Sequence, residues 1–388
     1  MNNFQMIAKT SFGFEDILSD ELLELGATDI RKAVRAVSFS GSLETMYKVN
    51  LRSRLALRIL KPVKTFLARS EVDLYKGIQS IDWSEFLSAS DTLAVDAVTV
   101  KSNITHSLYA ALKTKDAIVD QFRDKTGKRP DVDLRFPTVR INVHISNNVA
   151  SVALDSSGDS LHKRGYRMQQ GEAPLNETLA AGMVRLSGWD MKSPLTDIMC
   201  GSGTIVIEAA MMARNIAPGY LRNEFGFERW KDFDADLWNS LRSVAKDEVK
   251  DKLGFPIRGI DRSRQAIRSA VENAKAAGVL DDIEFIDMPF EHYTPEEIDQ
   301  TVITNPPYGG RITDEDLFEL YKQIGDQLKK KYSGVAWVLT ANREAAGKIG
   351  LHASRKIQLF NGALECRFLR FEVYKGSRKG AKRTADEV

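Results

Sequence analysis

Cysteine, histidine and long apolar runs are the scarce features of this 388-residue sequence. Its two cysteines, Cys200 and Cys366, lie far apart without a CxxC partner, and none of the five histidines falls in an HExxH spacing. No run of about 18 apolar residues occurs, and the N-terminus has no basic start followed by an apolar segment. These absences argue against a disulfide scaffold, a metal site, export and a membrane span, and they favour a reducing cytoplasm.

Neither sign of charge dominates, because 55 Lys and Arg residues against 53 Asp and Glu residues give a net charge of +2. With 43% hydrophobic and 28% charged residues, the composition is that of an ordinary globular protein. A disordered chain and a coiled coil are both disfavoured. The length suffices for two or three domains of roughly 150 residues, each able to bury a core without disulfides or metals.

The basic residues are nevertheless distributed unevenly. Between Arg31 and Arg69 there are ten Lys and Arg residues and a single acid, Glu44. This stretch predicts a phosphate-binding face, with an ordinary solvated surface as the alternative. The tail from Lys375 to Arg383 carries five basic residues and no acid, and it is expected to be disordered.

The hydrophobic pattern changes near residue 160. Before it, short strands alternate with helices, and Asn147-Asn148 separates two alternating apolar runs, which is typical of a hairpin. This part predicts two small α+β units. From residue 194 onward, apolar strands are each followed by a helix, which predicts a parallel sheet with helices on both faces and a ligand at the carboxyl ends of the strands.

A Gly-rich turn follows the first strand of that second part. Residues 197–204 read D-I-M-C-G-S-G-T, which is an acid at a strand end, then two glycines, then a helix. Such a turn lets a ligand approach the backbone and presents helix N-terminal amides to it. The third glycine of the dinucleotide fingerprint is missing, which disfavours NAD. The turn indicates nucleotide binding, with a tight packing turn as the alternative.

Two further acids stand at the ends of the next strands. Asp261, in RGIDRSRQAI, is expected to accept hydrogen bonds from ribose hydroxyls, or alternatively to cap the following helix. Asp287, in FIDMPF, is expected to meet an adenine amino group, or alternatively to be a plain turn residue. The acids and the Gly-rich turn are expected to converge at one edge of the sheet.

The most informative motif is N-P-P-Y at residues 305–308, directly after the apolar strand TVIT. Consecutive prolines fix the backbone and stop the strand, so Asn305 and the carbonyl of Pro306 are held rigidly at the sheet edge. Rigid acceptors suit an exocyclic amine, because hydrogen bonds from both N–H groups turn the nitrogen toward an electrophile. Tyr308 offers a stacking face for the base. A structural turn would explain Pro306-Pro307 but not the flanking Asn and Tyr.

These residues resemble the class I S-adenosylmethionine-dependent methyltransferases that methylate amines. The whole chain is similar to the THUMP-containing RNA guanine-N2 methyltransferases, and in particular to the first half of the bifunctional large-subunit rRNA methyltransferases. The similarity rests on the segment 161–183, the DxxCGSGTxxIEAA run, the GxD…NAxxAG run from 259 to 278 and the NPPYG element. Two departures stand out. Ile198 replaces the usual Pro, and no second methyltransferase half follows Val388, so only the guanine-N2 activity is expected to carry over.

The resemblance implies a fold and a division into domains. The expected fold is a Rossmann-like α/β methyltransferase domain, with a mostly parallel sheet and helices on both faces, preceded by an α+β ferredoxin-like and THUMP RNA-binding region. The expected boundaries are 1–55 for the ferredoxin-like unit, 56–160 for the THUMP domain, 161–375 for the methyltransferase domain and 376–388 for the disordered tail.

The resemblance also implies S-adenosylmethionine as the cofactor and a set of site residues. The residues expected to bind the cofactor are Asn176, Thr178, Asp197, Gly201, Ser202, Gly203, Thr204, Asp261 and Asp287. Those expected to hold the acceptor base are Asn305, Pro306, Pro307 and Tyr308. Those expected to contact RNA are Arg52, Arg54, Lys61, Lys64, Arg164 and Arg167. No metal is expected, and Cys200 is expected only to pack within its turn.

The function that follows is methylation of the exocyclic N2 amine of a guanine in 23S rRNA, either naked or in a large-subunit assembly particle. Two alternatives stay open. N-P-P-Y cannot itself distinguish the base, so a DNA adenine-N6 methyltransferase is the first, and a non-catalytic RNA-binding ribosome-assembly factor that keeps the fold is the second. The N-terminal α+β units favour RNA over duplex DNA. An intact Asn305 and Gly-rich turn argue against the non-catalytic factor.

Overall fold

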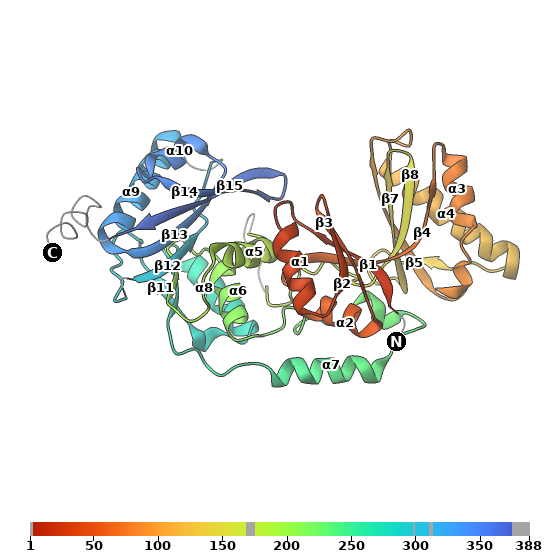
Figure 1. The fold of residues 1–388 in the computed structure, drawn as a ribbon, viewed down its shortest axis with the longest axis horizontal. Coiled ribbons are helices and arrows are strands. Elements are labelled where there is room, and N and C mark those ends of the chain that lie inside the picture. The colour runs from red at the N-terminus through yellow and green to blue at the C-terminus, as the bar shows by residue number, and fades with distance from the viewer. Residues whose placement is uncertain (1–2, 168–174, 298, 310–312, 375–388) are drawn as a thin grey trace. The chain divides into compact units, whose positions relative to one another are not determined.

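The computed structural model describes residues 3–167, 175–297, 299–309 and 313–374. Within them the chain forms two compact units, each built from discontinuous stretches of sequence (Figure 1). Unit 1 takes its residues from 3–10, 18–163 and 222–244, and unit 2 takes its residues from 11–17, 164–221 and 245–374.

Unit 1 is built on an eight-stranded sheet with the strand order β2-β3-β1-β4-β8-β7-β5-β6. Its pairings are antiparallel except for those that β5 makes with β6 and β7. The strands are β1 (Phe4–Thr10), β2 (Thr28–Ala33), β3 (Ala36–Gly41), β4 (Ala56–Leu67), β5 (Thr92–Val100), β6 (Asp131–Val132), β7 (Val139–Ser146) and β8 (Val149–Asp155). The helices in this part of the chain are α1 (Glu15–Glu24), α2 (Leu43–Arg52), α3 (Glu71–Gln79) and α4 (Ser107–Thr126).

The expected hairpin at Asn147-Asn148 is confirmed. Residues of β7 alternate strictly between buried and half-buried, as a strand with one face on a core requires. Asn147 and Asn148 both have positive φ, 49° and 63°, which is the backbone of a two-residue turn between twisted strands. Asn tolerates this conformation better than other residues with a side chain, so the sequence determines the turn locally.

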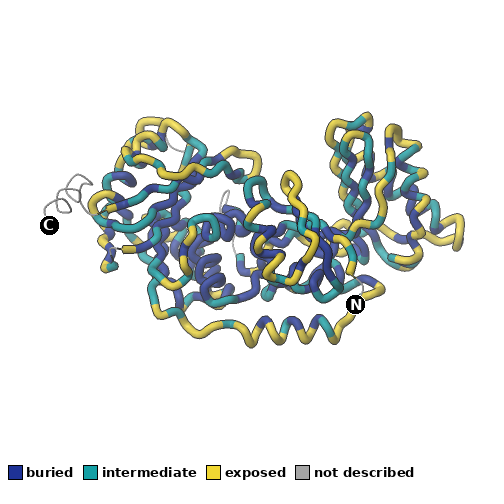
Figure 2. Tube along the Cα trace, in the orientation of Figure 1, coloured by how far each residue is buried: buried dark blue, intermediate teal, exposed yellow. Residues whose placement is uncertain are grey.

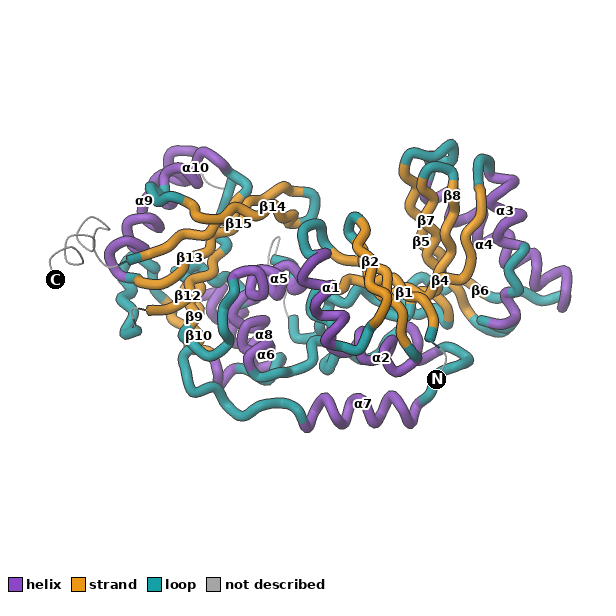
Figure 3. The backbone as a smooth tube through the Cα atoms, viewed as in Figure 1, coloured by secondary structure: helices purple, strands orange, loops and turns teal. Residues whose placement is uncertain are grey.

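Unit 2 is built on a seven-stranded sheet with the order β11-β10-β9-β12-β13-β15-β14 (Figure 3). The first five strands in this order pair in parallel, and β15 runs antiparallel to both of its neighbours. The strands are β9 (Leu195–Asp197), β10 (Ile257–Asp261), β11 (Ile283–Asp287), β12 (Asp299–Thr304), β13 (Ser333–Thr340), β14 (Ala353–Asn361) and β15 (Leu364–Val373). The helices of unit 2 are α5 (Glu177–Ser187), α6 (Thr204–Ala213), α8 (Arg264–Ala276), α9 (Asp314–Lys331) and α10 (Arg343–Lys348), while most of α7 (Ala235–Asp247) belongs to unit 1.

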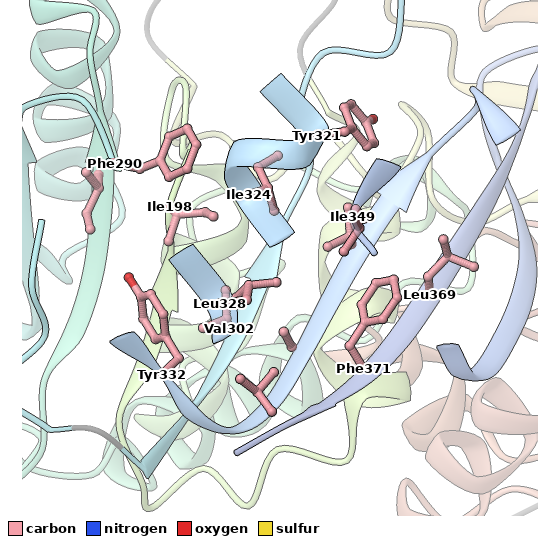
Figure 4. Close-up of a cluster of buried hydrophobic side chains, with 14 of the residues drawn as sticks. Ile198, Phe290, Val302, Tyr321, Ile324, Leu328, Tyr332, Ile349, Leu369 and Phe371 are labelled. Atoms are coloured by element: carbon pink, nitrogen blue, oxygen red, sulfur yellow. The ribbon is translucent and has the colours of Figure 1, made fainter. Parts of the chain in front are cut away.

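This sheet confirms the expected Rossmann-like, mostly parallel architecture. Strand order reverses at β9, because β10 and β11 lie on one side of it and β12 and β13 on the other. In open α/β sheets the crevice outside such a switch point is where ligands bind. One layer of the core beside it contains Tyr321 and Ile324 of α9 together with Leu369 and Phe371 of β15, all buried (Figure 4).

Segment 222–244 lies in the second half of the sequence yet packs in unit 1. The ring of Tyr47 stacks on that of Phe227 at 4.3 Å between centroids and meets Trp238 edge-on at 5.8 Å. Trp238 and Leu241 form the buried stripe of the N-terminal part of α7, and most residues around them are exposed (Figure 2). The guanidinium of Arg222 donates to four backbone carbonyls between residues 157 and 163. The segment is therefore attached to unit 1 by both apolar packing and hydrogen bonds.

Candidate active site

The Gly-rich turn after β9 is held by backbone and carboxylate hydrogen bonds. Cys200 donates its N–H to the carbonyl of Ile260 at 2.9 Å, and Gly203 donates to the carbonyl of Cys200 at 2.9 Å. Gly201 donates its N–H to Oδ2 of Asp261, also at 2.9 Å. Gly201 and Gly203 have φ of +54° and +82°, values that residues with a side chain rarely adopt. The turn therefore has one defined shape, and Asp261 contributes to it.

The two glycines differ in their surroundings. A Cβ on Gly203 would lie 3.0 Å from the Cβ of Ala270, whereas a Cβ on Gly201 would meet nothing within 4 Å. Gly203 is thus required for close packing, and Gly201 has open space beside it. Gly203 is also the N-cap residue of α6 and supplies no side-chain cap, so the helix begins with uncapped amides. This is a suitable place for a polar ligand to approach the backbone.

Asp197 is a buried carboxyl in this turn, with 1% of its surface exposed. Burial raises the pKa of Asp197 to about 7, and the nearby charge of Asp261 acts in the same direction. Two hydrogen bonds to Oδ1 oppose the shift, one from the hydroxyl of Thr304 at 2.7 Å and one from the N–H of Met199 at 3.1 Å. Because Thr304 ends β12, this contact joins the Gly-rich turn to the N-P-P-Y motif.

The three predicted acids do lie at neighbouring strand ends. Parallel pairing places Asp197 opposite Gly259 of β10, two residues before Asp261, and it pairs Asp261 with Asp287 of β11. Besides Gly201, Asp261 accepts from the N–H of Ser263 at 2.8 Å, and Ser263 itself caps α8. Asp287 is partly exposed, and its carboxylate lies 3.2 Å from Nε of Arg264. The acids are therefore brought together as the sequence predicts.

Asn305 follows β12 at the same edge of the sheet. Its side-chain Oδ1 is buried and accepts no hydrogen bond from the described residues. Pro306 is buried and Pro307 is exposed. The hydroxyl of Tyr308, half-buried, accepts a hydrogen bond at 2.6 Å from Nδ2 of Asn361, the last residue of β14. Burial raises the pKa of Tyr308, so its hydroxyl stays protonated. The motif thus combines an anchored ring with an acceptor that lacks a donor.

The N-terminus of α5 completes the surroundings. Oδ1 of Asn176 accepts from the N–H groups of Thr178 and Leu179 at 2.9 and 3.2 Å, so Asn176 is the N-cap. Thr178 is fully buried, and its Oγ1 has no partner among the described residues. The carboxylate of Glu177 accepts from Nε of Arg167 at 2.8 Å.

Arg167 belongs to this region rather than to a surface. Its Nη2 lies 3.3 Å from Oγ1 of Thr204, the first residue of α6, and 3.0 Å from the carbonyl of Leu175. Its Nη1 is buried without a partner in the described part of the chain. A guanidinium joining the starts of α5 and α6 was not predicted, because its partners are 10 and 37 residues away in the sequence. Asn273 was also missed: its Nδ2 donates to the carbonyl of Ser202 at 3.1 Å.

Two of the expected RNA contacts are wrong, because their side chains are buried. Arg164 is 1% exposed and forms an ion pair with the buried Glu208 at 3.5 Å between Nε and Oε1. Arg54 is 8% exposed, and it lies against the carboxylate of the buried Glu21, which accepts from the N–H of Arg54 at 2.9 Å. Both side chains are therefore withdrawn from the surface, and a movement of Arg164 toward a phosphate would leave Glu208 buried and uncompensated.

Apart from Arg167, described above, the remaining expected RNA contacts are closer to the surface. Lys61 lies 3.0 Å from Asp232 in an ion pair, and Lys64 is exposed and donates to Oγ of Ser80 at 2.9 Å. Arg52 is half-buried in the last turn of α2. The basic tail expected at 376–388 lies outside the described residues.

A nucleotide-like ligand with a carboxylate, hydroxyls and an amine fits these residues. The site offers buried donors without partners on Arg167 and Thr178, the uncapped amides of α6, open space beside Gly201, and carboxylates at three strand ends. Among the described residues, no three His, Cys, Asp or Glu side chains gather as metal ligands would. No described helix combines the length and apolar character that a membrane crossing requires.

Comparisons with known proteins were made over the whole chain. Family models match in succession: the RlmL ferredoxin-like domain over residues 5–60, the THUMP domain over 68–155 and the RMKL-like methyltransferase domain over 164–370. A putative RNA methyltransferase of Synechocystis, slr0064, is 41% identical over 95% of this chain and 96% of its own length.

The ribosomal RNA large subunit methyltransferase K/L of Syntrophotalea carbinolica is 43% identical over 93% of this chain. The chain spans about half the length of such K/L relatives, 52% in this case. Among solved structures, SMU.472, a putative methyltransferase complexed with SAH, is 31% identical with a TM-score of 0.86, covering 97% of this chain and 100% of that one.

Proposed function

We propose that this chain, which belongs to the RMKL-like methyltransferase family, methylates the exocyclic N2 amine of a guanine in 23S rRNA. The family membership confirms the resemblance noted from the motifs, and it makes the chain an S-adenosylmethionine-dependent methyltransferase with an N-terminal THUMP region. The base, its position and the kind of RNA are the proposed part. The expected domain boundaries and a cytoplasmic location belong to the same proposal.

The single observation that carries the proposal is the buried Oδ1 of Asn305, to which no residue in the described part of the chain donates. An amine brought to this edge supplies the missing N–H, and the carbonyl of Pro306 would accept the second N–H. With both protons directed at acceptors, the nitrogen lone pair points away from them. S-adenosylmethionine, when bound, supplies an electrophilic methyl group. The anchored ring of Tyr308 would stack on the base and hold its plane.

The remaining residues of the site would hold the cofactor. We assign its methionine portion to Asp197 and the turn 201–204, with Asn176, Thr178 and Arg167 around the carboxylate. Asp261 would accept from the ribose and Asp287 from the adenine amino group. Asn176 acts through the cap of α5, since its Oδ1 is already occupied by two backbone N–H groups.

RNA capture would come from unit 1. Lys61 and Lys64 of β4 and Arg52 of α2 remain the proposed phosphate contacts, and Lys64 is the most exposed of them. Phosphate contacts provide affinity without reading sequence, so the choice of base falls to the pocket around Tyr308. The target must be unpaired or flipped, because a stacked base cannot present its amine to a buried site.

The proposal is tested by nucleoside mass spectrometry after reaction with isotope-labelled S-adenosylmethionine. Protein-free rRNA, large-subunit assembly particles, tRNA and duplex DNA are offered in parallel, with Asn305→Ala as the matched inactive enzyme. The expected product is labelled N2-methylguanosine in 23S rRNA. Labelled N6-methyladenine in DNA would instead establish the first alternative. No labelled nucleoside in any substrate, despite cofactor binding, would favour a non-catalytic assembly factor.

A further inference from the structure

A groove of about 560 Å³ lies in unit 2 beside α10 and the β14–β15 hairpin. Its floor is apolar and includes Leu369 and Phe371 of β15, and its rim carries Arg343, Lys356 and Arg367. None of the residue roles assigned above uses this groove. We propose that it binds the nucleotides next to the target base, so that the methyltransferase unit itself holds single-stranded RNA; this inference rests on the proposed function.

Charge is the first argument. No Asp or Glu lines the groove. Glu365, outside the lining, lies 2.9 Å from Arg367 and 3.7 Å from Arg343, so one carboxylate is shared by two guanidiniums. The side chain of Lys356 is exposed and forms no ion pair or hydrogen bond with any described residue. The groove therefore presents an excess of positive charge, which suits phosphodiesters.

The chemistry of the floor favours a nucleic acid strand over an isolated phosphate. Leu369 and Phe371, 6% and 1% exposed, form the base of the floor and belong to the core shown in Figure 4, whereas the half-buried Ala346, Leu351 and Ala353 provide the accessible apolar surface of the groove. An apolar floor flanked by cations matches the base and the backbone of a nucleotide, and unpaired bases bind proteins through such surfaces. A duplex would keep its bases stacked inside and use only the rim.

Strand register places one end of the groove next to the catalytic edge. Thr304 of β12 pairs with Val338 of β13, so Asn305 and Thr340 lie at the same end of neighbouring strands, which run about 5 Å apart. Thr340, which lines the groove, pairs in turn with Arg367 of β15. The groove therefore begins one strand away from the asparagine proposed to hold the amine.

The groove then extends along the hairpin, away from that edge. From Arg367 to Phe371 it follows four residue-to-residue steps of β15, a length of about 13 Å, or roughly two nucleotide steps. A strand that delivers its target base to Asn305 would thus have its neighbouring nucleotides beside Arg343, Arg367 and Lys356.

The test compares adjacent residues of one strand. Lys356 lines the groove, whereas Arg355, equally exposed, precedes it in β14 and points to the opposite face of the hairpin. We would prepare Lys356→Ala, the double variant Arg343→Ala/Lys356→Ala and the control Arg355→Ala in the full chain. Binding of a fluorescein-labelled, unstructured RNA oligonucleotide would be followed by anisotropy across a salt series.

The double variant is expected to bind about tenfold more weakly at physiological salt, and its salt slope should fall by about 1.4, since each single-strand phosphate contact contributes about 0.7. Arg355→Ala should remain within about twofold of the parent protein. Crosslinks from 4-thiouridine-substituted RNA should map to peptides within 343–371. Equal affinity and slope in all variants, or crosslinks confined to unit 1, would overturn the proposal and leave the groove to a protein segment.

The anisotropy and crosslinking readouts do not depend on which base is methylated. If the methylated base proves to be other than guanine, the anisotropy and crosslinking results still decide whether the groove holds RNA. If the groove binds no RNA, the nucleoside analysis and Asn305→Ala still decide the reaction. Calorimetric S-adenosylmethionine affinity should be unchanged in all three variants, because none of the substituted residues lies in the proposed cofactor site.

Discussion

The polar side chains at the two halves of the proposed catalytic sheet edge differ in their hydrogen bonding. At β9 and β10, Asp197 and Asp261 accept hydrogen bonds from Thr304, Met199 and Gly201, so these acids fix the turn before any ligand arrives. At β12, Oδ1 of Asn305 is buried with no donor among the described residues. An unsatisfied buried acceptor costs about 1–3 kcal/mol of folding stability. The comparison teaches that the acids of one half already have their donors, whereas the acceptor proposed to hold the substrate amine has none among the described residues.

Among the variants that test this difference, Asn305→Ala is expected to have the largest effect, a loss of turnover. The substitution removes the acceptor that we propose aligns the reacting amine, and loss of one such group lowers kcat by about 10²–10³-fold. The affinity for S-adenosylmethionine should stay within about twofold, since Asn305 is proposed to contact the acceptor base and not the cofactor. Single-turnover methylation and calorimetry measure the two quantities separately.

Stability provides the control for Asn305→Ala. Because Oδ1 has no partner among the described residues to lose, the free energy of unfolding should be unchanged or slightly higher in the variant. A variant that loses stability and retains most of its turnover would show that the N-P-P-Y motif is a structural turn.

A second, smaller effect concerns Asp197. Its pKa is raised from an ordinary value of 3.8 to about 7, so between these values the folded protein binds more protons than the unfolded chain. Folding stability therefore falls as the pH rises from about 4 to about 7, and the loss persists above 7. Asp197→Asn can keep both hydrogen bonds to Oδ1 without carrying the charge. It should be more stable than the parent at pH 8 by on the order of 3 kcal/mol.

Urea unfolding at pH 5 and pH 8 checks this expectation. The difference between variant and parent should be small at pH 5 and large at pH 8. Asp287→Asn, which removes an exposed carboxylate at a neighbouring strand end, is the matched control for the loss of an acid at this edge. Parallel profiles for Asp197→Asn and its parent would contradict the raised pKa.

A third comparison lies within the turn itself. Gly203→Ala places a Cβ 3.0 Å from Ala270 in a left-handed backbone, and it should reduce the free energy of unfolding by about 2–3 kcal/mol. Gly201→Ala meets no neighbour, so it should cost only about 1 kcal/mol of stability. Its larger effect should be on cofactor affinity, because the new methyl group enters the open space. If Gly201→Ala binds S-adenosylmethionine normally, that space is not part of the cofactor site.

Local signals made much of this site predictable. Asp197, Asp261 and Asp287 each follow an apolar strand, and parallel strands bring their ends together, so the sequence was enough to predict their proximity. The burial of Arg54 and Arg164 was not predictable in the same way. Their acids, Glu21 and Glu208, are 33 and 44 residues away, and no local pattern distinguishes a buried guanidinium from an exposed one.

The attachment of segment 222–244 to unit 1 was likewise not predictable from any local sequence pattern. It depends on Tyr47 meeting Phe227 and Trp238, which lie about half the chain away. Deletion of residues 1–155 would remove Tyr47 and expose the rings of Phe227 and Trp238. Variants of the full chain are therefore the better test of RNA binding.

The smallest effect is expected at Tyr308, which links the acceptor half of the edge to the β14–β15 hairpin. Tyr308→Phe removes the hydrogen bond from Asn361 but keeps the ring, so kcat/KM should fall by less than about fivefold, in line with about 1 kcal/mol for one such bond. Tyr308→Leu also removes the stacking face, so the acceptor should bind more weakly by a further 1–3 kcal/mol, roughly the value for one stacked base. This loss should appear chiefly as a higher KM for RNA. Asn361→Ala should match Tyr308→Phe, and the double variant Tyr308→Phe/Asn361→Ala should be no worse than either. If Tyr308→Phe and Tyr308→Leu reduce kcat/KM equally, the hydroxyl of Tyr308 rather than its ring is the group needed for the reaction.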